Sequence, residues 1–343
     1  MTTKLPYYIL SIAAVDVNND SNIDVIFTLD GERKLYIIFN LGNNRFEKVK
    51  EYDILQSSGL LMPFATADMN NDNSIDIIFP FNDSTSHAII FENNGQGEFI
   101  EGLSLYSDGG INSLCTGDID RNGYLDIIIS IYGWGYNQIG IHYQMDNSMF
   151  RPFKTYQLEK YPLAIGIVDL NHDDFLDLIV TYPQDNSFST LLNTKSIESF
   201  EKNHYLTNIG PIFVKSADFN GDRHLDVVLI NYFSNNIVFY TNDGTGRLTY
   251  WKTIVGVNNP VSFALADYNN DSFIDIIIPN YHSNNITVYF NDEHEQFSNS
   301  SIYVTYPIPH LITTAHMNQD DKIDLVFSNE RYVAILLTRC DLP

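Results

Sequence analysis

The sequence predicts an all-β fold, a seven-bladed β-propeller of four-stranded antiparallel blades, and three observations support this prediction. A nine-residue acidic pattern returns seven times, beginning at Asp16, Asp68, Asp118, Asp169, Asp218, Asp267 and His316. Short apolar segments separated by turn residues surround each copy, and no segment shows helical periodicity. Seven units of about fifty residues account for nearly all of the 343 residues.

The sixth unit shows how one blade is predicted from the sequence. Alternating apolar residues at 262–266 precede the acidic pattern, and the β-branched run Ile276–Ile278 follows it. A Ser/Asn turn at 283–285 leads to Ile286–Tyr289, and a polar turn leads to a last strand that begins near Phe297. Four short strands joined by turns are typical of a propeller blade, whereas a linear β-solenoid would need much shorter repeats.

The whole chain, residues 1–343, is predicted to be one propeller domain. Its acidic loops span 16–24, 68–76, 118–126, 169–177, 218–226, 267–275 and 316–324. The last unit stops after Leu337 without a fourth strand, and Thr2 to Pro6 would be placed to complete it if the propeller closes. The alternative, that the chain is a fragment of a longer protein, stays open.

Each acidic loop is a candidate calcium site because oxygen-bearing side chains stand at its positions 1, 3, 5 and 9. Hard cations take six to eight oxygen ligands, and alternate residues of a tight loop can point inward together. The carbonyl of position 7 is the natural backbone ligand. The candidate ligands are Asp16, Asn18, Asp20, Asp24, Asp68, Asn70, Asp72, Asp76, Asp118, Asp120, Asn122, Asp126, Asp169, Asn171, Asp173, Asp177, Asp218, Asn220, Asp222, Asp226, Asp267, Asn269, Asp271, Asp275, Asn318, Asp320 and Asp324.

The alternative to a metal site is a plain turn, since Asp and Asn side chains also bond to nearby backbone groups. Six complete copies favour metal, because a turn alone does not require Asp at both position 1 and position 9. The seventh copy has His316 at position 1 and Lys322 beside the loop, so its site is expected to be weak or empty. The sequence therefore predicts about six Ca²⁺ sites, and the oxygen donors disfavour zinc.

Position 6 of these loops is expected to need a positive φ, which glycine adopts freely. Only the third copy has glycine there, Gly123, whereas the other copies have Ser, Asn, Asp or Arg. Most loops are therefore expected to be somewhat strained.

The formal net charge of −24 is explained largely by these loops, whose ligand positions hold twenty of the forty-three acidic residues. Six bound calcium ions would bring the net charge to about −12. No basic patch or stripe is visible, which argues against nucleic acid as a partner.

The segment from Phe219 to Asp226, with the run Val227–Leu229 after it, resembles the FG-GAP, or VCBS, repeat. Such repeats form the seven-bladed head of integrin α chains and many secreted propellers, including some fungal lectins. The resemblance covers all seven units and implies calcium loops between the first and second strands of each blade. Two features depart from the family pattern: most copies lack glycine at position 6, and the seventh copy has His316 at position 1. Both bear on calcium affinity more than on the fold.

The resemblance and the calcium loops together suggest a non-enzymatic adhesion or protein-interaction module, and the oligomeric state stays open. The alternatives are a calcium-dependent lectin and, second, a propeller-type polysaccharide lyase or hydrolase, although no nucleophile motif is visible. The candidate ligand-binding residues are the loop aromatics Tyr132, Trp134 and Tyr136, which suit a protein or glycan ligand.

Cytosolic calcium is too scarce to fill sites of this class, so an extracellular or cell-surface location is expected. The apolar N-terminal segment superficially resembles a signal peptide, but Ile12 to Val15 align with the strand that precedes the first loop. No targeting segment is therefore visible, and no apolar stretch is long enough to span a membrane.

Overall fold

The computed structural model describes residues 5–54, 60–82, 85–133, 136–147, 149–197, 199–292, 297, 299–305, 308–318, 320–329 and 331–338. The chain divides into two compact units. Unit 1 comprises residues 1–56, 95–98 and 257–343, and unit 2 comprises residues 57–94 and 99–256. The expectation of a single domain stays a prediction.

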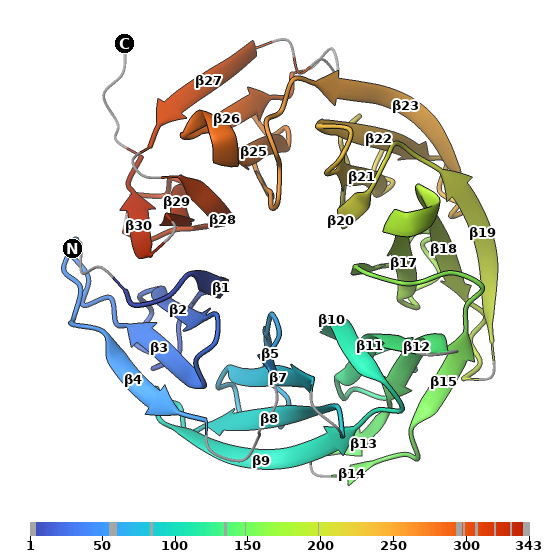
Figure 1. The fold of residues 1–343 in the computed structure, drawn as a ribbon, viewed down its shortest axis with the longest axis horizontal. Coiled ribbons are helices and arrows are strands. Elements are labelled where there is room, and N and C mark those ends of the chain that lie inside the picture. Colours follow the sequence, from blue (N-terminus) through green and yellow to red (C-terminus); the bar gives the residue numbers. More distant parts are fainter. Residues whose placement is uncertain are drawn as a thin grey trace. The chain divides into compact units, whose positions relative to one another are not determined.

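The predicted fold class is confirmed: the protein is an all-β, seven-bladed propeller of antiparallel blades with two short 3-10 helices (Figure 1). Unit 2 holds blades 2 to 5, and unit 1 holds blades 1, 6 and 7. Among the residues described, no helix is long and apolar enough to cross a membrane.

The blades of unit 2 each begin with an inner strand and end with an outer one. Blade 2 comprises β5 (Leu60–Leu61) and β6 (Ala65–Ala67), then β7 (Asp76–Asn82), β8 (His87–Asn93) and β9 (Phe99–Tyr106). Blade 3 comprises β10 (Gly110–Gly117), β11 (Asp126–Gly133), β12 (Tyr136–His142) and β15 (Lys154–Gln157), with a hairpin of β13 (Gln144–Asp146) and β14 (Met149–Phe150). Blade 4 comprises β16 (Ile165–Val168), β17 (Asp177–Tyr182), η1 (Pro183–Asp185), β18 (Ser187–Asn193) and β19 (Phe200–Leu206). Blade 5 comprises β20 (Pro211–Ala217), β21 (Asp226–Asn231), β22 (Asn236–Asn242) and β23 (Leu248–Val255).

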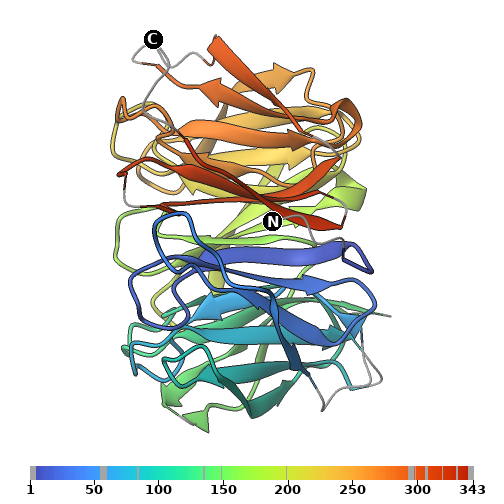
Figure 2. The same ribbon diagram turned by 90° about the vertical axis from the view of Figure 1, so that its left-hand side faces the viewer.

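Unit 1 contains two four-stranded blades and one with three described strands. Blade 1 comprises β1 (Ile9–Val15), β2 (Asp24–Leu29), β3 (Lys34–Ile38) and β4 (Lys50–Asp53), and Figure 2 shows this blue sheet from a second direction. Blade 6 comprises β24 (Ala264–Ala266), β25 (Asp275–Asn280), η2 (Tyr281–Ser283), β26 (Asn285–Phe290) and β27 (Asn299–Val304). Blade 7 comprises β28 (Pro309–Ala315), β29 (Asp324–Asn329) and β30 (Tyr332–Leu336).

Blade 6 matches the strand order expected from its sequence, although β27 begins two residues after Phe297. The expected strand at Ile12 to Val15 is present as the end of β1. Blade 7 has three strands within the described part of the chain and lacks a fourth there, as the sequence predicts. The backbone N–H of Leu5 donates to the carbonyl of Arg331 at the start of β30, whereas Thr2 to Lys4 lie outside the described residues.

The second strand of each blade is its most buried element. All six residues of β21 are buried, as are those of β2, β17, β25 and β29. A strand that is covered on both faces does not alternate apolar and polar residues, so its sequence becomes a continuous apolar run such as Val227–Ile230. The outer strand β19 instead has exposed residues between partly buried ones.

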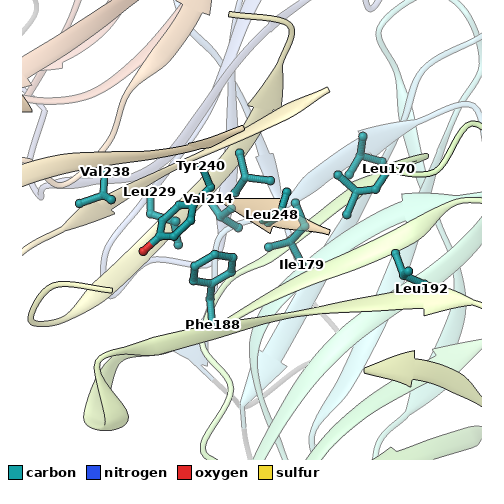
Figure 3. Packing of buried hydrophobic residues seen from close by; sticks show 11 residues of the cluster. Leu170, Ile179, Phe188, Leu192, Val214, Leu229, Val238, Tyr240 and Leu248 are labelled. Carbon is teal, nitrogen blue, oxygen red and sulfur yellow. The ribbon is translucent and has the colours of Figure 1, made fainter. Parts of the chain in front are cut away.

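Apolar side chains fill the space between neighbouring blades, as Figure 3 shows for blades 4 and 5. Leu170, Ile179 and Phe188 of blade 4 pack against Val214 and Tyr240 of blade 5. The Phe188 and Tyr240 rings meet edge to face with centroids 4.9 Å apart. This layer buries faces that a single blade would expose, so each blade is stabilised by its neighbours.

A buried amide also joins neighbouring blades, and the sequence did not predict it. Asn242, the last residue of the third strand of blade 5, donates from Nδ2 to the carbonyl of Leu170 in the acidic loop of blade 4, at 2.7 Å. Three other blades make the same bond to the position-2 carbonyl of the preceding loop, from Asn40 to Met317, from Gln144 to Met69 and from Asn193 to Ile119. These bonds satisfy loop carbonyls that are otherwise shielded from water.

Replacing Asn242 with Ala should lower the free energy of unfolding by about 2 kcal/mol, because buried hydrogen-bonding groups lose their partners. Urea unfolding followed by tryptophan fluorescence measures the change. Thr249→Ala, at an exposed position of β23, is the matched control and should leave stability nearly unchanged. Equal midpoints for the two variants would contradict the structural role of Asn242.

His142 ends β12 in an aromatic environment and is buried. Its ring stacks on Phe153 at 4.3 Å between centroids, and Phe150 meets it edge-on. Burial lowers the pKa of His142 from 6.5 to about 4, because the imidazolium would lose its hydration.

As the pH falls, His142 therefore becomes protonated in the unfolded chain before it does so in the folded protein. This lowers the free energy of unfolding as the pH falls from about 6.5 towards 4. The expected loss from His142 is about 2 kcal/mol between pH 7.5 and pH 5. His142→Phe should reduce the pH dependence of the unfolding free energy by that amount. Parallel pH profiles for the variant and the wild type would refute the assignment.

Candidate metal centres

The acidic loops lie where the sequence predicts, between the first and second strands of each blade. Position 9 of each loop is the first residue of the second strand, as with Asp226 at the start of β21. The same holds for Asp24, Asp76, Asp126, Asp177, Asp275 and Asp324.

The position-9 carboxylate is buried and anchors two separate stretches of backbone. In the fifth loop, Asp226 Oδ2 accepts a hydrogen bond from Phe219 N at 3.2 Å, and Oδ1 accepts one from Asn242 N at 2.9 Å. All seven loops repeat both bonds, from position 2 of the loop and from a residue at the end of the third strand or within two positions after it. Position 9 therefore has a structural role in every blade, including the seventh.

Burial disfavours the negative charge of the position-9 carboxylate, which is the form that accepts both backbone hydrogen bonds. It raises the pKa of Asp24 and Asp126 to about 7, and that of Asp226 to about 6, while the two backbone N–H groups lower it. The carboxylates at positions 1 and 5 add a smaller repulsion that raises it further. A divalent cation in the loop would favour the ionised form, so the electrostatics of the site suit a metal.

Positions 1, 3 and 5 shape the loop through bonds to backbone N–H groups. In the sixth loop, Asp267 accepts from Asp271 N at 2.9 Å and from Ser272 N at 2.8 Å. Asn269 Nδ2 donates to Asp271 Oδ2 at 2.8 Å, and Asp271 Oδ1 accepts from Phe273 N. These are the turn interactions that the sequence left as the alternative to metal. These bonds hold the loop in shape without an ion. To ligate a cation, Asn269 would have to turn its side-chain oxygen, and not its NH₂ group, towards the ion.

The predicted positive φ at position 6 is present in all seven loops. Its value runs from 54° at Asp321 to 90° at Gly123. Position 4 also has a positive φ in the six loops where it is described, an unpredicted feature seen at Asn19, Asn71, Arg121, His172, Gly221 and Asn270. Asn, Gly and His tolerate this left-handed conformation better than most residues, and they occupy position 4 in five of the six described loops, with Arg121 in the other.

The third loop provides the clearest metal geometry. Carboxylate oxygens of Asp118, Asp120 and Asp126 lie within 4.8 Å of one another, and no other group of three in the described part of the chain does so. This loop has Asp at position 3 and Asn122 at position 5, the reverse of the order in the other complete loops. A carboxylate therefore stands at position 3 of this loop, where the other complete loops provide an amide.

Asp120 shows that this oxygen cluster fits a hard cation. Its Oδ1 is buried and has no hydrogen-bond partner, and its Oδ2 lies 3.1 Å from Arg151 Nη1. Burial raises the pKa of Asp120, Arg151 lowers it, and Asp118 raises it. The unpaired oxygen and the all-oxygen donor set match calcium. Arg151 now compensates part of the charge that a cation would compensate.

The seventh loop is closed by a side chain. His316 Nδ1 donates to the carbonyl of Lys322 at 2.9 Å, so position 1 bonds directly to position 7. In a metal-binding loop, both groups would be ligands of the cation. Asn318 and Asp320 keep the turn bonds seen in other loops. The structure thus supplies a physical reason for the expected weakness of this site.

The candidate ligand-binding aromatics are only partly described. Tyr132 of β11 is half-buried, lies against Gly110 and has its ring 5.9 Å from that of Tyr161. Trp134 lies outside the described residues, and Tyr136 is described only as the first backbone position of β12. Tyr132 therefore packs in part against the neighbouring segment at Tyr161, and its role in ligand binding stays a prediction.

Comparison with protein families identifies these repeats. The FG-GAP-like repeat model matches residues 16–79, 68–129 and 218–278, together about half of the 343-residue chain. The chain belongs to the FG-GAP-like repeat family. No curated protein matches its sequence.

Solved structures share the fold. A crystal structure of BBS1N in complex with ARL6DN, soaked with mercury, superposes with a TM-score of 0.69 at 11% identity, covering 98% of this chain and 94% of that chain. A second crystal of the same complex, soaked with lead, gives a TM-score of 0.69 at 11% identity and covers 99% of this chain and 95% of the other. At this identity the likeness shows the fold alone.

Replacing His316 with Asp should create a seventh calcium site, because it restores the carboxylate of position 1 and frees the Lys322 carbonyl. Calcium titration by calorimetry should show one more bound ion per chain than in the wild type. His282→Asp, on the 3-10 helix of blade 6, is the control for added negative charge and should leave the stoichiometry unchanged. An unchanged stoichiometry in His316→Asp would contradict this reading of loop 7.

Proposed function

We propose that this chain is a non-enzymatic protein-interaction module, a calcium-stabilised propeller that presents a binding surface to another protein. Its membership of the FG-GAP-like repeat family supports the proposal. So does its fold likeness to BBS1N, which was crystallised in complex with ARL6DN. Interaction with a protein suits a fold in which rigid blades carry exposed turns.

The observation that carries the proposal is a group of exposed apolar side chains on blades 4 and 5. This group, the blade 4–5 patch, comprises Leu206, Ile209, Phe233 and Val255, each between 55% and 74% exposed. Large apolar side chains exposed together mark interaction sites more often than isolated ones do. Aromatic residues such as Phe233 are common anchors of protein interfaces.

The blade 4–5 patch is held rigidly. Ile209 N donates to Ser234 Oγ at 2.7 Å, and Tyr232 N donates to Gly210 O at 2.8 Å, which ties the loop after β19 to the turn after β21. Gly210 leaves room for the Phe233 ring, since a Cβ there would lie 2.5 Å from its Cδ2. A preformed apolar surface loses little conformational entropy on binding.

Calcium is proposed at about six of the seven loops, with a structural role. Loops 1 to 6 provide the oxygen donors, and the third loop has the converging carboxylates of Asp118, Asp120 and Asp126. With a dissociation constant of about 0.1 mM and about 2 mM free calcium, each site would add about 1.8 kcal/mol to the stability. The ion would neutralise repulsion around the buried position-9 carboxylates.

We further propose an extracellular or cell-surface location and a role in adhesion. Calcium sites of this class fill at millimolar concentrations, which are found outside cells. The net charge of −24 would then fall by half when six ions bind.

Glycan binding is the second candidate function, and one observation favours it. The rings of Tyr132 and Tyr161 lie 5.9 Å apart, and Tyr161 Oη donates to Asn112 Oδ1 at 3.3 Å. Flat aromatic faces beside an amide suit a sugar ring. Loss of glycan-array binding in Tyr161→Ala would favour a lectin.

Polysaccharide cleavage remains the third candidate and would require activity that depends on an Asp outside the loops.

Calorimetric titration of chelator-stripped protein with calcium tests the metal part of the proposal. About six ions should bind, and the melting temperature should rise strongly through the millimolar range. Asp118→Asn should remove about one ion, because it weakens the best-formed cluster. A melting temperature that does not respond to calcium or to chelator would overturn the proposal.

Site-specific photo-cross-linking tests the interaction part. A photoreactive residue at position 233 should cross-link one discrete protein in a mixture of cell-surface and secreted proteins from the source cells. The matched control carries the same residue at position 100, where Ile100 is 69% exposed on β9 of blade 2, and should give no such product. Identical cross-linking at the two positions would argue against the blade 4–5 patch as the binding surface.

A further inference from the structure

Two histidines from neighbouring acidic loops meet on unit 2. His172 of loop 4 and His224 of loop 5 place Nε2 and Nδ1 2.9 Å apart, with ring centroids separated by 5.0 Å and planes inclined by 55°. His172 is exposed and His224 is half-buried. Neither imidazole side chain is among the oxygen donors assigned to calcium, although the backbone carbonyl of His224 stands at position 7 of its loop.

The repeat explains why these side chains meet. Position 4 of one loop reaches position 6 or 7 of the next loop in three successive pairs of blades. Asn71 Nδ2 donates to Gly123 O at 3.4 Å, and Arg121 Nη1 lies 3.3 Å from Asp174 Oδ2. His172 at position 4 and His224 at position 7 are the third such pair, and only this one joins two metal-ligating side chains within the described loops.

We propose that His172 and His224 form a binding site for a borderline transition-metal ion such as Zn²⁺, Ni²⁺ or Cu²⁺ that links loops 4 and 5. Two imidazole nitrogens bound at about 2.0–2.1 Å to one ion lie about 2.9–3.4 Å apart for right-angled to tetrahedral arrangements. The observed 2.9 Å lies within this range. Small rotations of the rings would direct both lone pairs to a common point, and water would complete the coordination.

The surroundings hold one ring in place and favour a cation. Gly244 lies against His224, since a Cβ there would be 2.5 Å from its Cε1. Besides the buried Asp177 and Asp226 at position 9, loops 4 and 5 carry five aspartates, Asp169, Asp173, Asp174, Asp218 and Asp222. Arg121 pairs with Asp174 and Lys195 with Asp173, and Arg223 adds one further positive charge. Imidazole nitrogen selects these ions over calcium, which prefers oxygen.

The other copies supply substitutions that preserve the loops. Position 4 is Asn in loops 1, 2 and 6, with the same positive φ as His172, and position 7 is Asn22 in loop 1. His172→Asn and His224→Asn therefore remove a nitrogen ligand without changing the loop conformation or any assigned calcium ligand. His282→Asn, at an exposed histidine on blade 6, is the matched control.

Nickel titration by calorimetry, with calcium in millimolar excess, tests the proposal. The wild type and His282→Asn should bind one Ni²⁺ per chain, and His172→Asn and His224→Asn should each bind it roughly tenfold more weakly or worse. Electron paramagnetic resonance with Cu²⁺ should report two nitrogen ligands in the wild type and one in each variant.

Absence of stoichiometric nickel binding in the wild type, or equal affinity in both loop variants, would overturn the proposal. The test is independent of the calcium proposal, because calcium titration of the same variants should give the wild-type stoichiometry. A protein that binds nickel at these histidines but no calcium would leave the present inference intact while refuting calcium-stabilised loops.

Discussion

The structure depends on one repeated interaction, the buried carboxylate at position 9 of each acidic loop. In every blade it accepts one N–H from its own loop and one from a residue at or just after the end of the third strand, as Asp226 does from Phe219 and Asn242. Three strands of a blade are thereby fixed around a single side chain. A buried carboxylate is expensive unless it is well hydrogen-bonded, so the rest of the loop must be organised to supply these donors.

The same interaction explains why the acidic pattern persists in loop 7 although its position 1 has changed. Asp324 keeps both backbone bonds, and His316 bonds directly to the position-7 carbonyl. The pattern thus combines two separable roles. Position 9 builds the blade, whereas positions 1, 3 and 5 shape the loop and provide the oxygens that suit a cation.

The fold was predictable because its information is local and repeated. The Asp-rich loop, the β-branched run after it and the period near fifty residues each fix one feature of a blade, and they agree in every copy. The inter-blade amides were harder to predict, because Asn40, Asn193 and Asn242 follow position 1 by 24 residues but blade 3 uses Gln144 at a different spacing. The contact of His172 with His224 depends on how successive loops lie together, which no single repeat encodes.

The bond from Asn242 to the carbonyl of Leu170 crosses from one repeat to the one before it. A single fifty-residue repeat therefore cannot satisfy the backbone of its own loop. An open row of such repeats would end with an amide that lacks its carbonyl on one side and a carbonyl that lacks its donor on the other. Only an array whose last repeat meets its first can give both end groups a partner, as Asn40 of the first blade does for Met317 of the seventh.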